Sequence, residues 1–331
     1  MLKIARLAKD RRVLVSLGLA IGAALGAFAI RGIDWTEVRV QIANASPFAV
    51  AVALALALLS AYVRAMRWRL MFVGHLVGVV RLFFVENAAQ GLNNVAPIHV
   101  LDEPAILTML TLRDRLPGPV VVATLVMTRM QDLGVTLFLV AVAMAVEPTL
   151  SSRVVPAVVA GVTFVALLIA LLKVGWLSRR FSLVGRIPGV DRYHETVMMM
   201  LSRKRRFGAT VLLTLGYWLL LGPVTYLLAR GMGVELTLLQ ATILVLGTIF
   251  FATAVPGLPG ALGTFELAVV ELAGIWDVPQ PLAVGFGLVL HLVLYLPQVV
   301  IALVVLPREG LSLLGKPNRG LLEAAEETLT G

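Results

Sequence analysis

Long apolar runs dominate this sequence and limit what it can fold into. Of its 331 residues, 59% are hydrophobic and 14% are charged, and the mean hydropathy is +0.94. Soluble domains are about half apolar and about a quarter charged. Because backbone amides in lipid must be hydrogen-bonded within their own segment, such runs fold as membrane-spanning helices. The runs lack the alternation of a membrane barrel, so the sequence predicts an all-α, polytopic membrane protein.

The basic residues indicate how these helices are oriented. The net charge is +9, and arginine and lysine gather between the apolar runs. Since cytoplasmic loops are enriched in these residues, we expect the basic loop 175–206 and both termini to be cytoplasmic, in the inner or plasma membrane. The charge indicates contact with anionic headgroups rather than with nucleic acid. The expected spans are Val13–Ile30, Phe48–Val63, Val120–Val146, Val154–Val174, Phe207–Leu228, Leu236–Thr253 and Leu282–Leu306.

A first polar interruption lies between two arginine-containing segments, Arg64–Arg69 and Leu112–Gly118. Both segments are expected on the cytoplasmic side, so the chain between them must enter the membrane and return. It carries a break rich in amides and carboxylates around Pro97 and Glu103. A continuous lipid-facing helix would not carry these groups, whereas two half-helices whose break lines a cavity would.

A second interruption has the sequence VPGLPGALGTFE, residues 255–266. Proline and glycine disfavour a helix interior, and the segment around them must enter and return on the outer side. The order span, broken hairpin, span therefore occurs twice, in opposite orientations, over residues 48–146 and 207–306. Inverted repeats with interrupted helices are typical of transporters. We expect about seven or eight helical segments in one transmembrane domain, 1–306, followed by a short cytoplasmic tail, 307–331.

The glycines and carboxylates of the breaks are candidates for a headgroup site. A helix that starts after Gly260 and Gly263 would present free N–H groups and a positive dipole end to an anion. Glu266 would lie in its first turn, where it could pair with a ligand amine, accept a proton or cap the helix. Glu103 follows the first break in the same way. Asn94 could contact a headgroup or join helices.

Arg129 and Asp132 lie three residues apart on an apolar span, so they share a helix face and can pair. They are either a structural ion pair or part of transport, with Arg129 as an anchor for a phosphate. His99 in the first break and His291 in the last span are packing residues or proton switches. No histidines have metal-ligand spacing, and the chain has no cysteine, so we expect no metal site and no cofactor.

Four motifs resemble those of a known family. They are RAMRW at Arg64–Trp68, similar to Arg-x-x-Arg-Trp; Asn94, Pro97 and Glu103, similar to Asn…Pro-x-Arg-x-Gly-Glu; Arg129 and Asp132, similar to Glu-Arg-x-x-Asp; and Pro259, Gly260, Gly263 and Glu266, similar to Pro-Gly-Gly-x-Gly-x-x-Glu. Over residues 35–306 the chain resembles the flippase-like transmembrane family named for the membrane region of lysylphosphatidylglycerol synthase.

The resemblance implies a membrane domain that moves a polar-headed lipid between leaflets. Relatives pair it with a soluble aminoacyl-transfer domain, which we do not expect after the last span, so synthase activity is not expected either. The chain departs from the family at His99 and His291, where relatives have arginine, and at Thr128 and Ala261. Because histidine titrates near neutrality, these departures suggest that activity depends on pH.

Three functions remain open. The first is a non-enzymatic translocator that passes a phospholipid or lipid-linked precursor, with an anionic or phosphate-containing headgroup, through a cavity formed by the two broken hairpins; ATP is not implied. The alternative is a non-catalytic scaffold that presents lipid to a separate transferase. A lipid-modifying enzyme would need a nucleophile or metal constellation, and none stands out.

Overall fold

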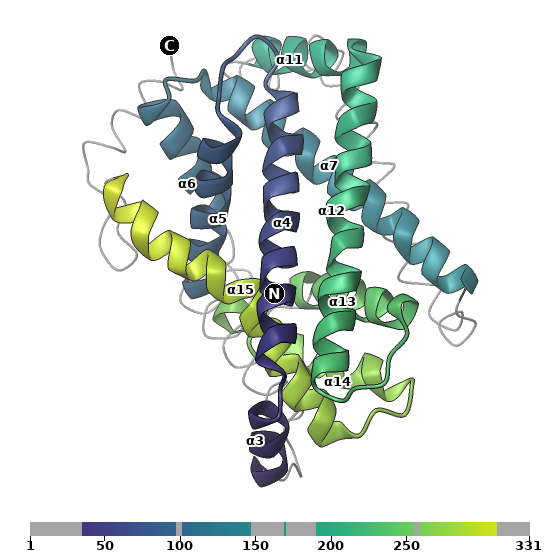
Figure 1. Ribbon diagram of the computed structural model, residues 1–331. Helices are drawn as coiled ribbons and strands as arrows, with labels where there is room; N and C mark the ends of the chain where they lie inside the picture. The colour runs from purple at the N-terminus through teal and green to yellow at the C-terminus, as the bar shows by residue number, and fades with distance from the viewer. Residues whose placement is uncertain (1–34, 97–100, 147–168, 170–189, 255–257, 310–331) are drawn as a thin grey trace, which may run out of the picture. The chain divides into compact units, whose positions relative to one another are not determined.

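The computed structural model describes residues 35–96, 101–146, 169, 190–254 and 258–309 (Figure 1). Every regular element in these ranges is a helix, which confirms the predicted all-α class. Among the described residues, four helices are long and apolar enough to cross a membrane, as a multi-pass protein requires. They are α4 (Pro47–Met71), α7 (Gly118–Val146), α12 (Lys204–Gly231) and α15 (Gln280–Arg308).

These four helices contain four of the predicted spans. The predicted spans Val13–Ile30 and Val154–Val174, and the tail beyond Glu309, lie outside the described residues. Two shorter helices lie outside the interruptions: α3 (Trp35–Ala43) and α11 (Val190–Ser202).

Both interruptions separate helices where the sequence predicts a break. In the first, α5 (Val79–Val95) is followed by α6 (Asp102–Thr108), which continues as the π-helix η1 (Met109–Arg113). In the second, α13 (Leu238–Ala254) is followed by the short 3-10 helix η3 (Pro259–Ala261) and by α14 (Thr264–Gly274). Each half thus has the order long helix, 17-residue helix, short helix and 29-residue helix. The inverted orientation of the two halves stays a prediction.

The chain forms two compact units, which are described separately. The first comprises residues 1–59, 90–102 and 219–302. The second comprises residues 60–89, 103–218 and 303–331.

The first unit packs its helices through small residues. A Cβ built on Gly222 would meet Thr242 of α13, and one on Gly231 would meet Ala49 of α4. Such close approach is typical of membrane helices, since lipid supplies little hydrophobic force between them. The core of this unit includes Phe265 of α14 and Phe286 of α15, both fully buried.

The second unit is organised around the end of α4. Trp68 is 1% exposed, and its indole N–H donates to Thr124 Oγ1 of α7 at 3.1 Å. Arg81, near the start of α5, pairs with Asp114, just after η1, at 3.0 Å. The two outer ends of the first broken hairpin therefore lie together, although its entry into a membrane stays a prediction.

Candidate functional site

The turn before α14 depends on glycines. Gly260 has φ +69° and Gly263 has φ +85°, in the left-handed region that residues with a Cβ resist. A Cβ on Gly260 would lie 3.0 Å from the backbone oxygen of Asn94, at the end of α5. The end of α5, where the first interruption begins, and the glycine turn of the second interruption thus meet within the first unit.

Asn94 also joins helices through its side chain. Its Nδ2 donates to Gln298 Oε1 of α15 at 2.8 Å. This contact agrees with the role of interhelical glue that the sequence left open. Next to it, the side-chain oxygen Oδ1 of Asn93 accepts a hydrogen bond from the Leu101 backbone N–H across the first break at 3.3 Å. His99, another candidate, lies outside the described residues.

Both carboxylate oxygens of Glu266 are used within the protein. Oε2 accepts the backbone N–H of Gly263 at 2.7 Å, and Oε1 lies 2.6 Å from His291 Nδ1. The side chains of Glu266 and His291 are 6% and 7% exposed. Glu266 therefore caps the start of α14 and holds His291 of α15 at the same time.

The contacts of His291 define how many protons the pair holds. Nε2 lies 2.8 Å from the Gly260 carbonyl oxygen, which can only accept, so Nε2 carries a hydrogen. The Nδ1–Oε1 contact then needs one proton, held either by the imidazole or by the carboxyl group. In either form the pair has no net charge, which suits its burial. Phe265 stacks on the ring, and Tyr295 meets it edge-on, each with centroids 4.4 Å apart.

A second carboxylate pair follows the first break. Glu103, in the first turn of α6, lies 3.2 Å from Arg129 Nε of α7. In contrast to the pair at His291, these side chains are 54% and 47% exposed. Arg129 lies about 16 Å along α7 from its first residue, near the middle of a hydrocarbon core of about 30 Å.

The two pairs occupy corresponding places in the chain. Glu103 precedes Arg129 by 26 residues, and Glu266 precedes His291 by 25. Arg129 and His291 each lie eleven residues after the first residue of a 29-residue helix, α7 and α15. In each half, the carboxylate that follows the break thus holds a basic side chain midway along the next long helix.

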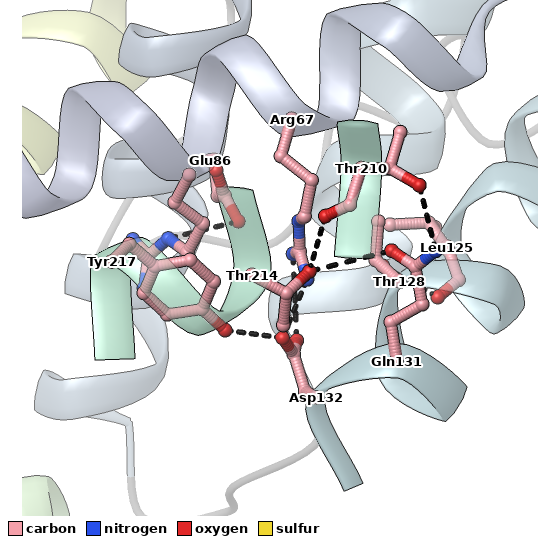
Figure 2. A network of polar contacts seen from close by, with 10 residues as sticks. Arg67, Glu86, Leu125, Thr128, Gln131, Asp132, Thr210, Thr214 and Tyr217 are labelled. Atoms are coloured by element: carbon pink, nitrogen blue, oxygen red, sulfur yellow. Dashed lines mark hydrogen bonds and ion pairs between the residues drawn. The ribbon is translucent and has the colours of Figure 1, made fainter. Parts of the chain in front are cut away.

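Asp132 belongs to a separate, largely buried network in the second unit (Figure 2). Arg67 of α4 is 1% exposed, and its Nη1 lies 2.5 Å from Asp132 Oδ1. The Tyr217 hydroxyl of α12 donates to the same oxygen. Arg129 and Asp132 therefore each have an ion-pair partner on another element, and the interpretation of the two as a pair within one helix is replaced.

Other polar groups complete this network. Gln131 Nε2 donates to Thr210 Oγ1 at 2.7 Å, and Thr214 Oγ1 accepts from Arg67 Nη1 at 3.4 Å (Figure 2). The sequence analysis gave Arg67 no site role and did not single out Tyr217. A usable signal was present, because Thr210, Thr214 and Tyr217 are spaced four and three apart and share one face of an apolar helix.

Comparison with known protein families matches residues 15–302 to the lysylphosphatidylglycerol synthase TM region. This range includes both interruptions, both carboxylate pairs and the Arg67–Asp132 network. The chain belongs to this family. Comparison with curated proteins finds no match. The resemblance based on the four motifs is thus confirmed, and the chain is a multi-pass membrane protein of the lysylphosphatidylglycerol synthase TM family.

Proposed function

We propose that the protein moves a polar-headed lipid, a phospholipid or a lipid-linked precursor, between the leaflets of the inner or plasma membrane without changing it covalently. Family membership supports a role with lipids. The observation that carries the proposal is the half-exposed pair between Glu103, at the start of α6, and Arg129, well inside the long apolar helix α7. Charged side chains that face lipid at this depth cost several kcal/mol. The exposed side of the pair is therefore expected to border a water-filled space, such as a cavity formed by the broken hairpins.

Such a space suits a lipid headgroup. The Arg129 guanidinium can bind a headgroup phosphate through two parallel hydrogen bonds, while the acyl chains stay in the bilayer. Glu103 would release Arg129 to the phosphate or pair with an amine on the same headgroup. Both termini are placed in the cytoplasm on the basis of the basic loops.

The buried Glu266–His291 pair supports a mechanism with two states. In transporters built from repeats, the two halves exchange conformations as access alternates. The second state would then expose Glu266 and His291 and bury Glu103 and Arg129. The glycine turn at Gly260 would change shape in this exchange.

Translocation of labelled lipids in liposomes that contain the purified protein tests the proposal. The wild type is expected to move lipid. Arg129→Ala should lower the rate by about tenfold, since it removes a charge-assisted contact. Glu266→Gln should lower it too, because it disturbs the closed pair. Arg230→Ala, at an exposed arginine outside both pairs, should leave the rate unchanged.

Two results would contradict the proposal. Absence of translocation of any lipid by the wild type would favour the scaffold that presents lipid to a separate transferase. Unchanged rates in both Arg129→Ala and Glu266→Gln would remove these residues from the mechanism.

A further inference from the structure

Three arginines gather where α4 ends and α12 begins, in the second unit. The guanidinium groups of Arg69 and Arg203 lie close enough to that of Arg206 to repel it. Among the described residues, no carboxylate lies within ion-pair distance of any of the three. A cluster of like charges without a counter-ion favours the binding of an anion.

Arg206 is fixed in place but keeps donors for a ligand. Its Nε donates to the Leu70 carbonyl oxygen at 2.5 Å, and its Nη2 donates to that of Phe72 at 3.3 Å. These carbonyls lie at the C-terminal end of α4, where a cation is favourable. A guanidinium has five N–H donors, so the remaining donors of Arg206 can bind an anion. Arg69 Nη1 donates to the same Phe72 carbonyl oxygen at 3.5 Å. Capping of α4 therefore holds Arg69 and Arg206 side by side but does not account for Arg203.

An apolar crevice adjoins this cluster and includes Arg206 in its lining. It is shallow: about 230 Å³ of space lies among its lining atoms with the open mouth included, and its enclosed part is about the size of one water molecule. Its other lining residues belong to α4, α7, α11 and α12, except Val73, which follows α4. They are Leu70, Met71, Val73, Met127, Met200, Phe207 and Thr210. Methionine is flexible and polarizable, so it adapts to apolar ligands of irregular shape. A ligand that uses both features must join a negative charge to an apolar body.

We propose that Arg69, Arg203 and Arg206 bind the phosphate of an anionic phospholipid whose acyl chains lie against the apolar side chains at the mouth of the crevice. A free phosphate would use the arginines but not these apolar side chains.

This site is distinct from the pair proposed to handle the moving headgroup. Met127 lines the crevice, and Arg129 lies two residues later on α7, so the two side chains point about 200° apart around the helix. A lipid at the mouth of the crevice contacts α4, α7, α11 and α12 together. It therefore stabilises the fold of the second unit and does not have to move between leaflets.

The test uses the full chain in an uncharged detergent, with lipid binding measured by native mass spectrometry and thermal unfolding. The probes are phosphatidylglycerol, phosphatidylcholine and glycerophosphate, which lacks acyl chains. Phosphatidylglycerol should bind and raise the unfolding temperature in a concentration-dependent way. The other two probes should do neither at the same concentration.

Variants then assign the binding to the cluster. Arg206→Gln should weaken phosphatidylglycerol binding by about tenfold, because one charge-assisted contact is lost. Since Arg206 also caps α4, the exposed Arg203→Gln is measured beside it and should weaken binding in the same direction. Arg205→Gln, which removes the same charge from a neighbouring exposed residue, should change affinity by less than about twofold.

Four outcomes would overturn the proposal. Glycerophosphate that binds as tightly as phosphatidylglycerol would identify a site for soluble anions. Phosphatidylcholine that binds as tightly would remove the role of negative charge. Equal losses of affinity in Arg203→Gln and Arg205→Gln would reduce the effect to general surface charge. Unchanged affinity in both Arg203→Gln and Arg206→Gln would remove the cluster from the binding site.

Discussion

Arg67 is a cation buried in α4, and its charge is balanced by Asp132 of α7. The Tyr217 hydroxyl and Thr214 Oγ1 complete its surroundings. A buried ion pair adds little net stability, but loss of one partner leaves an uncompensated charge in a low-dielectric interior. Each member of this pair therefore depends on the opposite charge of the other to be stable in the interior.

The first prediction concerns this dependence. Arg67→Met should lower the free energy of unfolding by up to about 3 kcal/mol, because Asp132, whose side chain is 19% exposed, is left without its cation. The double variant Arg67→Met/Asp132→Leu should recover most of that loss, since two apolar side chains can replace the pair. Equilibrium unfolding in a mild detergent measures both. A double variant as unstable as the single one would contradict the pairing.

The second prediction concerns the contacts of the Glu266–His291 pair. The groups that face the His291 ring are Glu266, the Gly260 carbonyl, Phe265 and Tyr295. His291→Phe keeps an aromatic ring but removes both ring nitrogens, so Glu266 Oε1 and the Gly260 carbonyl oxygen lose their buried partners. The free energy of unfolding should therefore fall by about 1–3 kcal/mol, as measured by unfolding in a mild detergent.

His291→Gln provides the control for this loss. Its amide can still donate a hydrogen bond in place of the ring, so the variant should lose less unfolding free energy than His291→Phe. The measurement is the unfolding of both variants beside the wild type. A His291→Phe variant as stable as the wild type would show that His291 serves packing alone.

At the scale of helices, the crossing of α5 and α15 is the tightest contact that the glycines reveal. A Cβ built on Gly91 would lie 2.0 Å from the backbone oxygen of Gln298 and 2.7 Å from the Ala302 side chain. Pro297 precedes Gln298 in α15 and has no backbone N–H to donate to the helix. Backbone meets backbone at this crossing, so little can move aside.

The third prediction follows from this crossing. Gly91→Ala should lower the unfolding free energy by about 1–3 kcal/mol through overpacking. Gly216→Ala, inside α12 with no atom within 4 Å of the added carbon, should be neutral or stabilise by up to about 1 kcal/mol. Thermal unfolding of the two variants measures the difference. If Gly91→Ala were the more stable of the two, the close crossing would be wrong.

Local signals in the sequence were enough to predict the four long helices and both breaks. They did not predict α3, or α11, which lies within the segment 175–206 expected to be a loop. Apolar length predicted α4, α7, α12 and α15, and proline, glycine and charge marked both interruptions. The helix α4 extends beyond its predicted span and includes Arg69 in its last turn. Long basic side chains are tolerated at helix ends, so arginines can continue the helix. These features are set by residues that are close together in the chain, so they can be predicted from a single sequence.

Partners between distant elements could not be predicted in the same way. Spacing favoured a pair between Arg129 and Asp132, because residues three apart share a face. The fold gives Asp132 the buried Arg67, 65 residues away, and gives Arg129 the carboxylate of Glu103. For Glu266 the sequence left capping and function open, and the structure adds His291 as a partner of the cap.

At the scale of the whole molecule, the two halves carry carboxylate pairs at equivalent places in the chain. The pair after the first break is half exposed, and the pair after the second is buried. Arg129 and His291 lie at the same place in α7 and α15, so exposure is what distinguishes the two pairs. In the proposed mechanism the first pair is exposed to water, since lipid would not accept it.

Water access at Glu103 is therefore the most direct test. The chain has no cysteine, so Pro104→Cys, beside Glu103 and exposed, can be labelled in liposomes with a hydrophilic thiol reagent. Leu292→Cys, beside His291 on the apolar helix α15 and 57% exposed, is the matched control, and we expect this position to face lipid. Because thiols react as thiolates, which need water, Pro104→Cys should react at least about tenfold faster than Leu292→Cys. Equal, slow reaction at both positions would contradict a water-filled path at the first break and the lipid transport built on it.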